Sequence, residues 1–529
     1  MIPNLLMTFS DWNPQFFREV KGRLKPRNIA TTVVSSLLVQ GAILFYLWGA
    51  LPTKVTSYSR YCVGKDEYNW NKCFVDALGN VQINWQLWWF DLFQTLSWLI
   101  PFVLLVAGIY MLIGDLAKEE RRGTLNFIRL SPQTSRSILV GKLLGVPLIP
   151  FLAVVLAVPL HIWSSINAAI LPKELISIYL LTIAACCFLY TAAVFYAFLG
   201  GAQGWLGAIV VWVFYSVLFQ VWQHGRYSQI DGYPFFRQWY TIQVGHTLEL
   251  FVTFVVVTFA IATFWLWRSI NRRFRNPSQV LLSKRQSYLM TLSFELFIFG
   301  FVFHDYPEWC SRNSFLDLTG LMVVNLFWFI LIIAALTPHR QTLLDWARYR
   351  RNGESKTQRK RWRRTLVHDL VWGDKSPAMV AIALNLLIPI VLFTPWIATW
   401  NDDSPKIAAF ISLIFSASFL LICAAIAQLI LFGKSQKRAL FAAGIIGALI
   451  LLPMIGMSLL GAHPGSKTAL LWLFSAMPIA AMEHASFTTV AIGFLAHLST
   501  LTLLVARQTR QLKRAGESEL KALMAHRTN

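Results

Sequence analysis

A partial match to a nucleotide-binding loop is the first place where this sequence could carry chemistry. Such a loop has the form GxxxxGK[ST], because glycines let backbone amides approach phosphate and the lysine reaches it. Gly433-Lys434-Ser435 supplies the end of the pattern, but position 428 is Gln where the first glycine belongs. The sequence also contains no Leu-Ser-Gly-Gly. We therefore expect no catalytic residue, no metal site and no bound cofactor, with Lys434 anchoring the end of a membrane span.

A buried acid is the second place, because ion-coupled transport needs ionisable groups at membrane depth. Glu295 lies within an apolar stretch and is the best candidate. His161, Asp91, Glu249 and Glu483 fall nearer the predicted outer ends of spans, where solvation explains them. For Glu295 the alternatives are a mechanistic role, burial in an interhelical hydrogen bond, or a misplaced span boundary, and all three stay open.

Two cysteines are the third place where this sequence could carry chemistry. Cys62 and Cys73 lie in one polar loop with ten residues between them and no histidine nearby to suggest zinc. In an oxidising periplasm such a pair favours a disulfide. Free thiols and a pairing with Cys310 are the alternatives.

Composition identifies the elements that must position these residues. Of all residues 56% are hydrophobic and 14% are charged, and apolar runs of about twenty residues recur along the chain. Each span must satisfy its own backbone hydrogen bonds in lipid, which favours helices. We predict an all-α polytopic membrane protein with twelve spans, near residues 29–50, 88–114, 138–165, 175–199, 204–222, 246–267, 288–305, 316–337, 378–399, 407–433, 438–460 and 487–506.

The predicted domain organisation follows from these spans. An amphipathic helix over residues 11–25 precedes them, started by Asn13 and Pro14, and is expected to lie along the membrane surface. The predicted domains are the interfacial segment 1–28, a first six-span repeat 29–270, a linker 271–287, a second six-span repeat 288–506, and a basic tail 507–529.

The basic residues indicate the orientation. With the N-terminus inside, 37 of the 47 Lys and Arg residues fall in cytoplasmic segments, as the positive-inside rule expects. The net charge of +22 thus mainly reflects the predicted orientation of the chain in the membrane. A run such as 356–364 is better explained by attraction to anionic lipid than by nucleic-acid binding. We expect both termini in the cytoplasm of a bacterial inner membrane, with membrane lipids and no nucleic acid as partners.

Residues 115–145 form the first dense charged patch between two apolar runs. A helix is expected to stop at Gly123, and Thr124 to cap a short second helix carrying Leu125, Phe127, Ile128 and Leu130. Ser131-Pro132 is then a new helix start signal. The segment predicts a helix, a short crosswise helix and a new span.

The two sets of six spans share one pattern of loops. In each half a long charged cytoplasmic segment separates the second and third spans, at 115–137 and 338–377. Ser131-Pro132 opens the third span and Ser376-Pro377 opens the ninth. Because six is even, both halves have the same orientation, which suggests two parallel repeats around an axis normal to the membrane.

The run Glu119-Glu120-Arg121-Arg122-Gly123-Thr124-Leu125, followed by Leu130-Ser131-Pro132 and Gly141-Lys142-Leu143-Leu144-Gly145, resembles a known family. It is similar to the segment between the second and third spans of type-two ABC exporter permeases, over roughly residues 10–270. The resemblance implies an interfacial helix, six spans and a coupling helix that docks on an ATP-hydrolysing subunit. The second half departs from it, because 338–377 lacks the acidic pair followed by Arg-Arg-Gly-Thr.

The resemblance also implies partners and site residues. We expect two separate ABC ATPase subunits that carry the ATP and Mg, and a lipid-like, glycan or amphiphilic cargo that moves by alternating access at the seam between the repeats. The alternatives are an ion-coupled carrier using Glu295 and a non-transporting scaffold. The expected docking residues are Glu119, Glu120, Arg121, Arg122, Gly123, Thr124, Leu125, Ile128, Ser131 and Pro132, with Asp374, Lys375, Ser376 and Pro377 in the second half.

Overall fold

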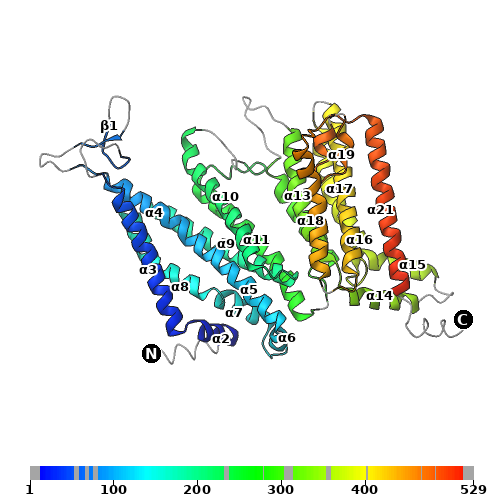
Figure 1. Ribbon diagram of the computed structural model, residues 1–529, viewed down its shortest axis with the longest axis horizontal. Helices are drawn as coiled ribbons and strands as arrows, with labels where there is room; N and C mark the ends of the chain where they lie inside the picture. The colour runs from blue at the N-terminus through cyan, green and yellow to red at the C-terminus, as the bar shows by residue number, and fades with distance from the viewer. Residues whose placement is uncertain are drawn as a thin grey trace. The chain divides into compact units, whose positions relative to one another are not determined.

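A computed structural model of the chain describes residues 12–52, 59–65, 71–74, 81–231, 238–277, 279–302, 314–352, 359–400, 403–435, 437–465, 467–482 and 484–515 (Figure 1). Among the described residues the regular structure is helical, apart from one antiparallel ribbon of Gly64–Lys65 with Asn71–Lys72 and two isolated bridges. The predicted all-α fold class is confirmed. Glu483, Cys310 and part of the basic run 356–364 lie outside the described residues.

The chain divides into two compact units. Unit 1 comprises Met1–Arg237 and Gln243–Arg275, and unit 2 comprises Gln238–Ile242 and Asn276–Asn529. The division at residue 275 lies inside the predicted linker 271–287. Each unit is described by itself below.

Unit 1 begins with a short helix and continues through long apolar helices. Its elements are α2 (Pro14–Arg23), α3 (Pro26–Gly49), β1 (Gly64–Lys65), β2 (Asn71–Lys72), α4 (Trp85–Phe102), the π-helix η1 (Val103–Ala107), α5 (Gly108–Arg121), α6 (Thr124–Arg129), α7 (Ser135–Gly145), α8 (Leu148–Asn167), α9 (Pro172–Phe198), α10 (Gly204–Asp231) and α11 (Leu248–Arg275).

Unit 2 has two helices, α14 and α15, between its second and third long apolar segments. Its elements are α12 (Lys284–Phe299), α13 (Ser314–Leu336), α14 (Arg340–Asn352), α15 (Arg359–Trp372), α16 (Met379–Ala398), α17 (Asp403–Leu431), α18 (Arg438–Leu459), α19 (Ala469–Leu473), α20 (Ile479–Met482) and α21 (Phe487–Ala515).

Ten helices of the described chain are long and apolar enough to cross a membrane. The predicted count of twelve is not confirmed. α12 covers the predicted seventh span but has only 16 residues, and the fifth is represented by the shorter apolar stretch Gly204–Gln220. The predicted third span, 138–165, is wrong at its start: α7 ends at Gly145, and the apolar helix α8 begins after Pro147.

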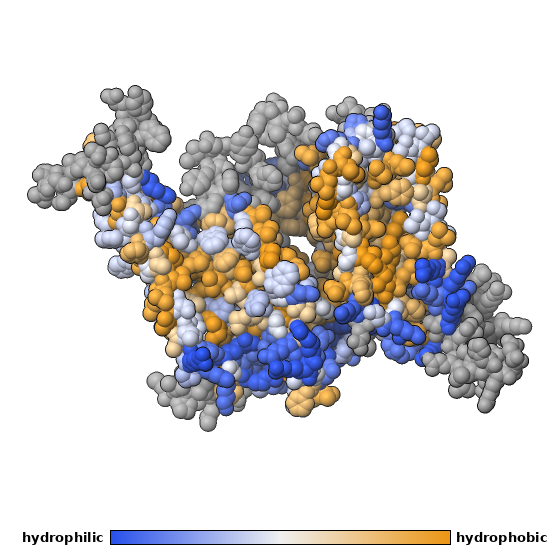
Figure 2. Space-filling model, in the orientation of Figure 1, coloured by the Kyte–Doolittle hydropathy of each residue, from blue (hydrophilic) through white to orange (hydrophobic). Residues whose placement is uncertain are grey.

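Apolar side chains explain how the units can sit in lipid. Figure 2 shows apolar residues along the long helices of each unit and hydrophilic residues gathered where α2, α5 and α7 meet in unit 1. Large apolar side chains remain exposed on these helices, among them Val155, Val213 and Phe264 in unit 1. An apolar surface of this extent needs an apolar environment.

One helix in unit 1 is unusually long. α4, η1 and α5 form a continuous helix of 37 residues, Trp85–Arg121. Pro101 lies inside it and has no amide hydrogen to donate. The helix widens into η1 two residues later, and the Tyr190 hydroxyl donates to the Leu104 carbonyl there at 2.7 Å. The buried core of unit 1 surrounds this helix, with α9 among the helices that pack on it.

Candidate functional site

The turn between α5 and α6 is made by glycine. Gly123 has φ +71°, a left-handed conformation that costs glycine little and other residues more. The helix therefore stops as the sequence predicts. The predicted cap is wrong, because Gly123 itself occupies the N-cap position of α6 and the Thr124 hydroxyl instead donates to the Glu119 carbonyl at 3.3 Å.

The two faces of α6 differ sharply in exposure. Leu125 and Ile128 are 3% and 6% exposed, so they hold α6 against unit 1. Phe127 and Leu130 are 79% and 86% exposed. The prediction that Leu125 and Ile128 form part of a docking surface is therefore corrected: their side chains face the core, and Phe127 and Leu130 project from the helix instead.

The start of α7 also differs from the prediction. Ser131 and Pro132 lie in a bend, and α7 begins at Ser135. Thr134 is the true cap, since its side chain accepts a hydrogen bond from the Ser137 amide at 3.2 Å. At the same end of α7, Arg275 of α11 donates to the Ser135 hydroxyl at 3.2 Å.

A buried lysine lies behind this turn. Lys142 on α7 is 1% exposed. Its Nζ atom lies 2.9 Å from Asp115 Oδ2, 2.8 Å from Glu119 Oε2 and 3.4 Å from Glu19 Oε1. We call these four residues the carboxylate cluster. Burial by itself lowers the pKa of Lys142, but Asp115, Glu119 and Glu19 outweigh it and the pKa is raised.

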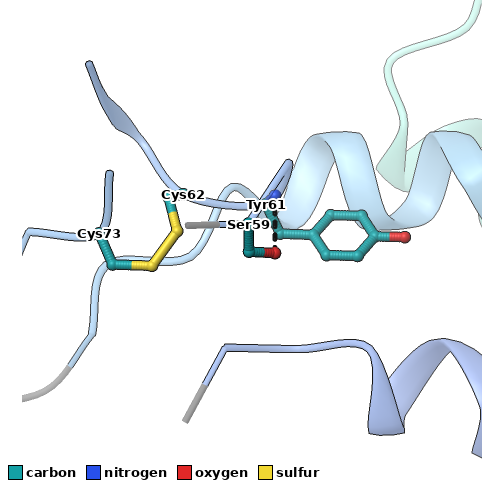
Figure 3. The surroundings of a disulfide bond; sticks show 4 residues. All are labelled: Ser59, Tyr61, Cys62 and Cys73. Atoms are coloured by element: carbon teal, nitrogen blue, oxygen red, sulfur yellow. Dashed lines mark hydrogen bonds between the residues drawn. A yellow bond between two sulfur atoms is a disulfide. The ribbon is translucent and has the colours of Figure 1, made fainter. Parts of the chain in front are cut away.

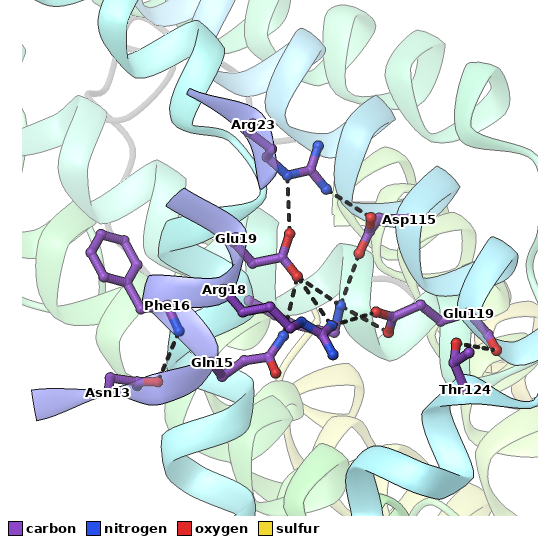
Figure 4. Close-up of polar contacts among 10 residues, drawn as sticks. Asn13, Gln15, Phe16, Arg18, Glu19, Arg23, Asp115, Glu119 and Thr124 are labelled. Atoms are coloured by element: carbon purple, nitrogen blue, oxygen red, sulfur yellow. Dashed lines mark hydrogen bonds and ion pairs between the residues drawn. The ribbon is translucent and has the colours of Figure 1, made fainter. Parts of the chain in front are cut away.

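Arginines complete the charge balance of the carboxylate cluster. Arg23 donates to Glu19 at 3.1 Å and to Asp115 at 2.7 Å, and Arg18 donates to Glu119 at 2.9 Å (Figure 4). The three carboxylates have oxygens within 4.8 Å of one another, an arrangement that can hold a metal ion. Here the Lys142 ammonium supplies the compensating positive charge.

Helix α2 fits against α7 by its polar face. Asn13 caps α2 by accepting from the Phe16 amide at 3.0 Å, and its amide donates to the Ser137 carbonyl at 2.8 Å. A Cβ at Gly141 would come within 2.7 Å of Asn13 Oδ1, and one at Gly145 within 2.5 Å of Glu19 Cβ. Two glycines one turn apart thus let α2 approach α7 closely.

The predicted acidic pair is divided by this packing. Glu119 is turned into the carboxylate cluster, whereas Glu120, Arg121 and Arg122 are exposed. The exposed Glu120 and the half-buried Glu119 therefore have different roles. Glu119 fastens α5 to α2 and α7, whereas Glu120 takes no part in the carboxylate cluster.

The predicted second docking segment is also largely buried. Lys375 is exposed, but Ser376 and Pro377 are buried and Asp374 is half-buried. The Ser376 hydroxyl donates to the Asp369 and Gly373 carbonyls at 2.5 and 2.9 Å. Ser376 and Pro377 are therefore corrected from contact residues to parts of the packed junction between α15 and α16.

Lys284 is the centre of that junction and is 2% exposed. Its ammonium donates to the carbonyls of Leu370 at 2.7 Å and Pro377 at 3.1 Å, and to the Ser376 hydroxyl at 2.6 Å. A further bond of 3.3 Å reaches the Asp369 carbonyl. We call this the carbonyl cage. Burial lowers the pKa of Lys284 to about 8, against the smaller opposing effects of Asp374 and Asp369.

The segment of unit 1 between α3 and α4 holds the disulfide. Cys62 and Cys73 are bonded (Figure 3). Next to them, the Tyr61 hydroxyl donates to Asp91 at 2.6 Å and Arg60 donates to the same carboxylate at 2.7 Å. These bonds tie the loop to α4, where the sequence predicted only solvation for Asp91.

Three charged residues of the carboxylate cluster were missed as site residues by the sequence reasoning: Glu19, Asp115 and Lys142. One signal was available. Lys142 is the only Lys, Arg, Asp or Glu in the predicted span 138–165, and a lone charge in an apolar run needs a partner.

Comparison of the chain with protein-family models, with curated proteins and with solved structures gives no match.

Proposed function

We propose that this chain is the membrane-spanning subunit of an ATP-driven exporter, and that α6 is its contact with a separate ATPase subunit. One observation carries the proposal. A six-residue helix and the C-cap residue after it present Phe127 and Leu130 to the outside at the charged end of unit 1, between two helices long enough to cross a membrane.

The chemistry of α6 fits a protein partner. Two large apolar side chains exposed among charged neighbours are typical of a surface that another protein covers. Leu125 and Ile128 hold the helix in place from beneath, so the exposed pair is presented by an anchored element. A groove lined by apolar residues, with a basic rim to meet Glu120, would complement it.

The connection of α6 to the membrane supports a coupling role. α6 follows the 37-residue helix Trp85–Arg121 directly, and the carboxylate cluster fastens the end of that helix to α2 and α7. Movement of a docked partner would therefore be passed to a helix that crosses the membrane. We propose two such ATPase subunits carrying ATP and Mg, and a lipid-like, glycan or amphiphilic cargo.

The proposed setting is a bacterial inner membrane with both termini in the cytoplasm. The concentration of Lys and Arg in the segments assigned to that side supports it. α6 and the ATPase subunits would then share one compartment.

Purification from native membranes in mild detergent tests this function. We expect an ATPase subunit to accompany the wild-type chain, and Phe127→Ala or Leu130→Ala to reduce its recovery by about tenfold or more, as loss of an interface anchor does. Phe45→Ala is the matched control, because Phe45 is 81% exposed on the apolar helix α3. The proposal fails if the wild-type chain brings down no ATPase, or if all three variants retain it equally.

A further inference from the structure

Helix α12 has one buried polar face inside unit 2. Lys284, Ser287, Thr291 and Glu295 are each 2% exposed or less. Their spacings of three, four and four residues place them along one side of the helix. We call this set the polar column, and at 1.5 Å per residue it is about 16 Å long.

Side chains from α13 and α16 meet the polar column. The Asn385 amide on α16 donates to the Ser287 hydroxyl at 2.9 Å. On α13, Trp328 Nε1 donates to the Thr291 hydroxyl at 3.4 Å, and the Asn325 amide donates to Glu295 Oε2 at 3.2 Å. Polar side chains of α13 and α16 therefore meet α12 at Ser287, Thr291 and Glu295, above the carbonyl cage at Lys284.

The Glu295 end of the column is short of hydrogen-bond donors. Among the described residues, Glu295 Oε1 and Asn325 Oδ1 are both buried and accept no hydrogen bond. An ionised carboxylate with a single amide donor, in apolar surroundings, lacks the compensation that a buried charge requires. A proton on Glu295 removes the charge and gives this acceptor-rich site a donor.

Neighbouring charges do not supply that compensation. α16 carries no titratable side chain between Met379 and Ala398. On α13 the only titratable residue is Asp317, eight residues from Asn325 and so about 12 Å along the helix. On α12 itself the other titratable residues are Lys284, Arg285 and Tyr288. From the elements packed against it, the Tyr240 hydroxyl donates to the Leu296 carbonyl, and Asp374 and Asp369 act on Lys284 at the far end of the polar column.

We propose that Glu295 is a proton-binding site: its carboxyl is protonated in this structure, and it exchanges that proton with water along the polar column when the seam between α12 and α13 loosens. Binding takes one proton from water onto a carboxylate oxygen, and release returns it to water. The ligand is a proton rather than a metal cation, because Glu295 and Asn325 offer too few oxygens for a metal shell. This inference does not rest on the proposed exporter function.

Labelling with dicyclohexylcarbodiimide tests the proposal on the purified full chain, because this apolar reagent modifies protonated carboxyl groups in apolar surroundings. We expect an adduct on Glu295 near neutral pH, identified by peptide mass spectrometry, whose yield falls as the pH rises. Glu295→Gln should abolish it. A site that stays unlabelled at every pH at which the protein is folded would overturn the proposal, as would a yield independent of pH once normalised to the reagent's own pH dependence.

A second variant keeps the test decisive if Glu295→Gln does not fold. Asn325→Ala removes the donor that favours the ionised carboxyl, so labelling should persist to a pH higher by about one unit. Asn385→Ala changes the column next to Ser287, two turns away, and should leave the labelling midpoint unchanged. Equal midpoints in the wild type and Asn325→Ala would contradict the assigned site. Because no ATPase is present, the result is independent of whether one docks on α6.

Discussion

The two units each bury a lysine at a helix junction, but they surround it with opposite chemistry. Lys142 in unit 1 meets three carboxylates, and Lys284 in unit 2 meets three carbonyls and a hydroxyl. The pKa of Lys142 is raised, whereas that of Lys284 is lowered to about 8. Burial is nearly the same in both, so the partners decide the difference.

This difference indicates which interactions stabilise each junction. The carboxylate cluster joins full charges from α2, α5 and α7, so removal of one member leaves the others uncompensated. The carbonyl cage joins one charge to dipoles, so its loss leaves neutral acceptors without donors, at lower cost.

The largest effect should come from Lys142→Met. It leaves three carboxylates close together with less positive charge to balance them, so the free energy that holds α2 on α7 should fall by about 3 kcal/mol or more. Hydrogen exchange of the amides in α2 measures this as a loss of protection on the order of 100-fold. Lys118→Met, which changes an exposed residue of α5, is the control. Unchanged protection of α2 would show that the carboxylate cluster is not what fastens it.

Lys284→Met should have a smaller effect, because only neutral acceptors lose their donor. We expect the junction of α12 with α15 to lose about 1 to 3 kcal/mol. The amides at the end of α15 report it by hydrogen exchange, and Arg285→Met is the exposed control. If Lys284→Met lowered the free energy of its junction as much as Lys142→Met does, the two junctions would not differ in the way proposed.

The pH dependence of the two junctions should differ in sign. Lys284 has a folded-state pKa of about 8, below the value near 10.4 of an unperturbed lysine, so the folded state binds fewer protons between these values. The free energy of unfolding should therefore rise across that window by about 1 kcal/mol per pH unit, because the unfolded state holds the proton that Lys284 has released in the folded state. This gain is lost as the pH falls through 8.

Lys142 provides the contrast within the same protein. Its raised pKa means that its stabilisation is fully present below about pH 10 and is lost only at higher pH. Hydrogen exchange from pH 7 to 10, corrected for the intrinsic exchange rate, should show constant protection in α2 and rising protection at the end of α15. Parallel changes in the two regions would contradict the opposite pKa directions.

The smallest effect on stability should come from the exposed face of α6. Phe127→Ser and Leu130→Ser should change the free energy of unfolding by less than about 0.5 kcal/mol, because both side chains are exposed. Leu125→Ser, on the buried face, should cost about 2 kcal/mol or more. Thermal unfolding in detergent compares them. Equal losses for the two faces would mean that α6 is packed differently from the arrangement described here.

Much of the fold follows from the sequence because its signals are local. The helical class needs only long apolar runs, and the stop at Gly123 needs only a residue that tolerates positive φ. Asn13 and Pro14 likewise start α2 as predicted, since the cap and the first helical position are neighbours in the chain.

The site was harder to predict because it depends on contacts between distant residues. Glu119 and Lys142 lie 23 positions apart, and Glu19 is 100 positions before Glu119, so no local pattern shows that they meet. The predicted span over 138–165 failed for a related reason. The sequence pattern places Lys142 within an apolar run, whereas the structure pairs it with Glu19 of α2, and the helix breaks at Val146 and Pro147 before α8 begins.

The length of the helix from Trp85 to Arg121 has a mechanical consequence. At 1.5 Å per residue its 37 residues measure about 55 Å, well beyond the roughly 30 Å hydrocarbon thickness of a bilayer. α5 accounts for about 21 Å of that length and runs without interruption from η1 to the charged turn at Gly123. Only Arg122 and Gly123 separate its end from α6. A load applied at α6 would therefore act directly on the helix around which the core of unit 1 is packed.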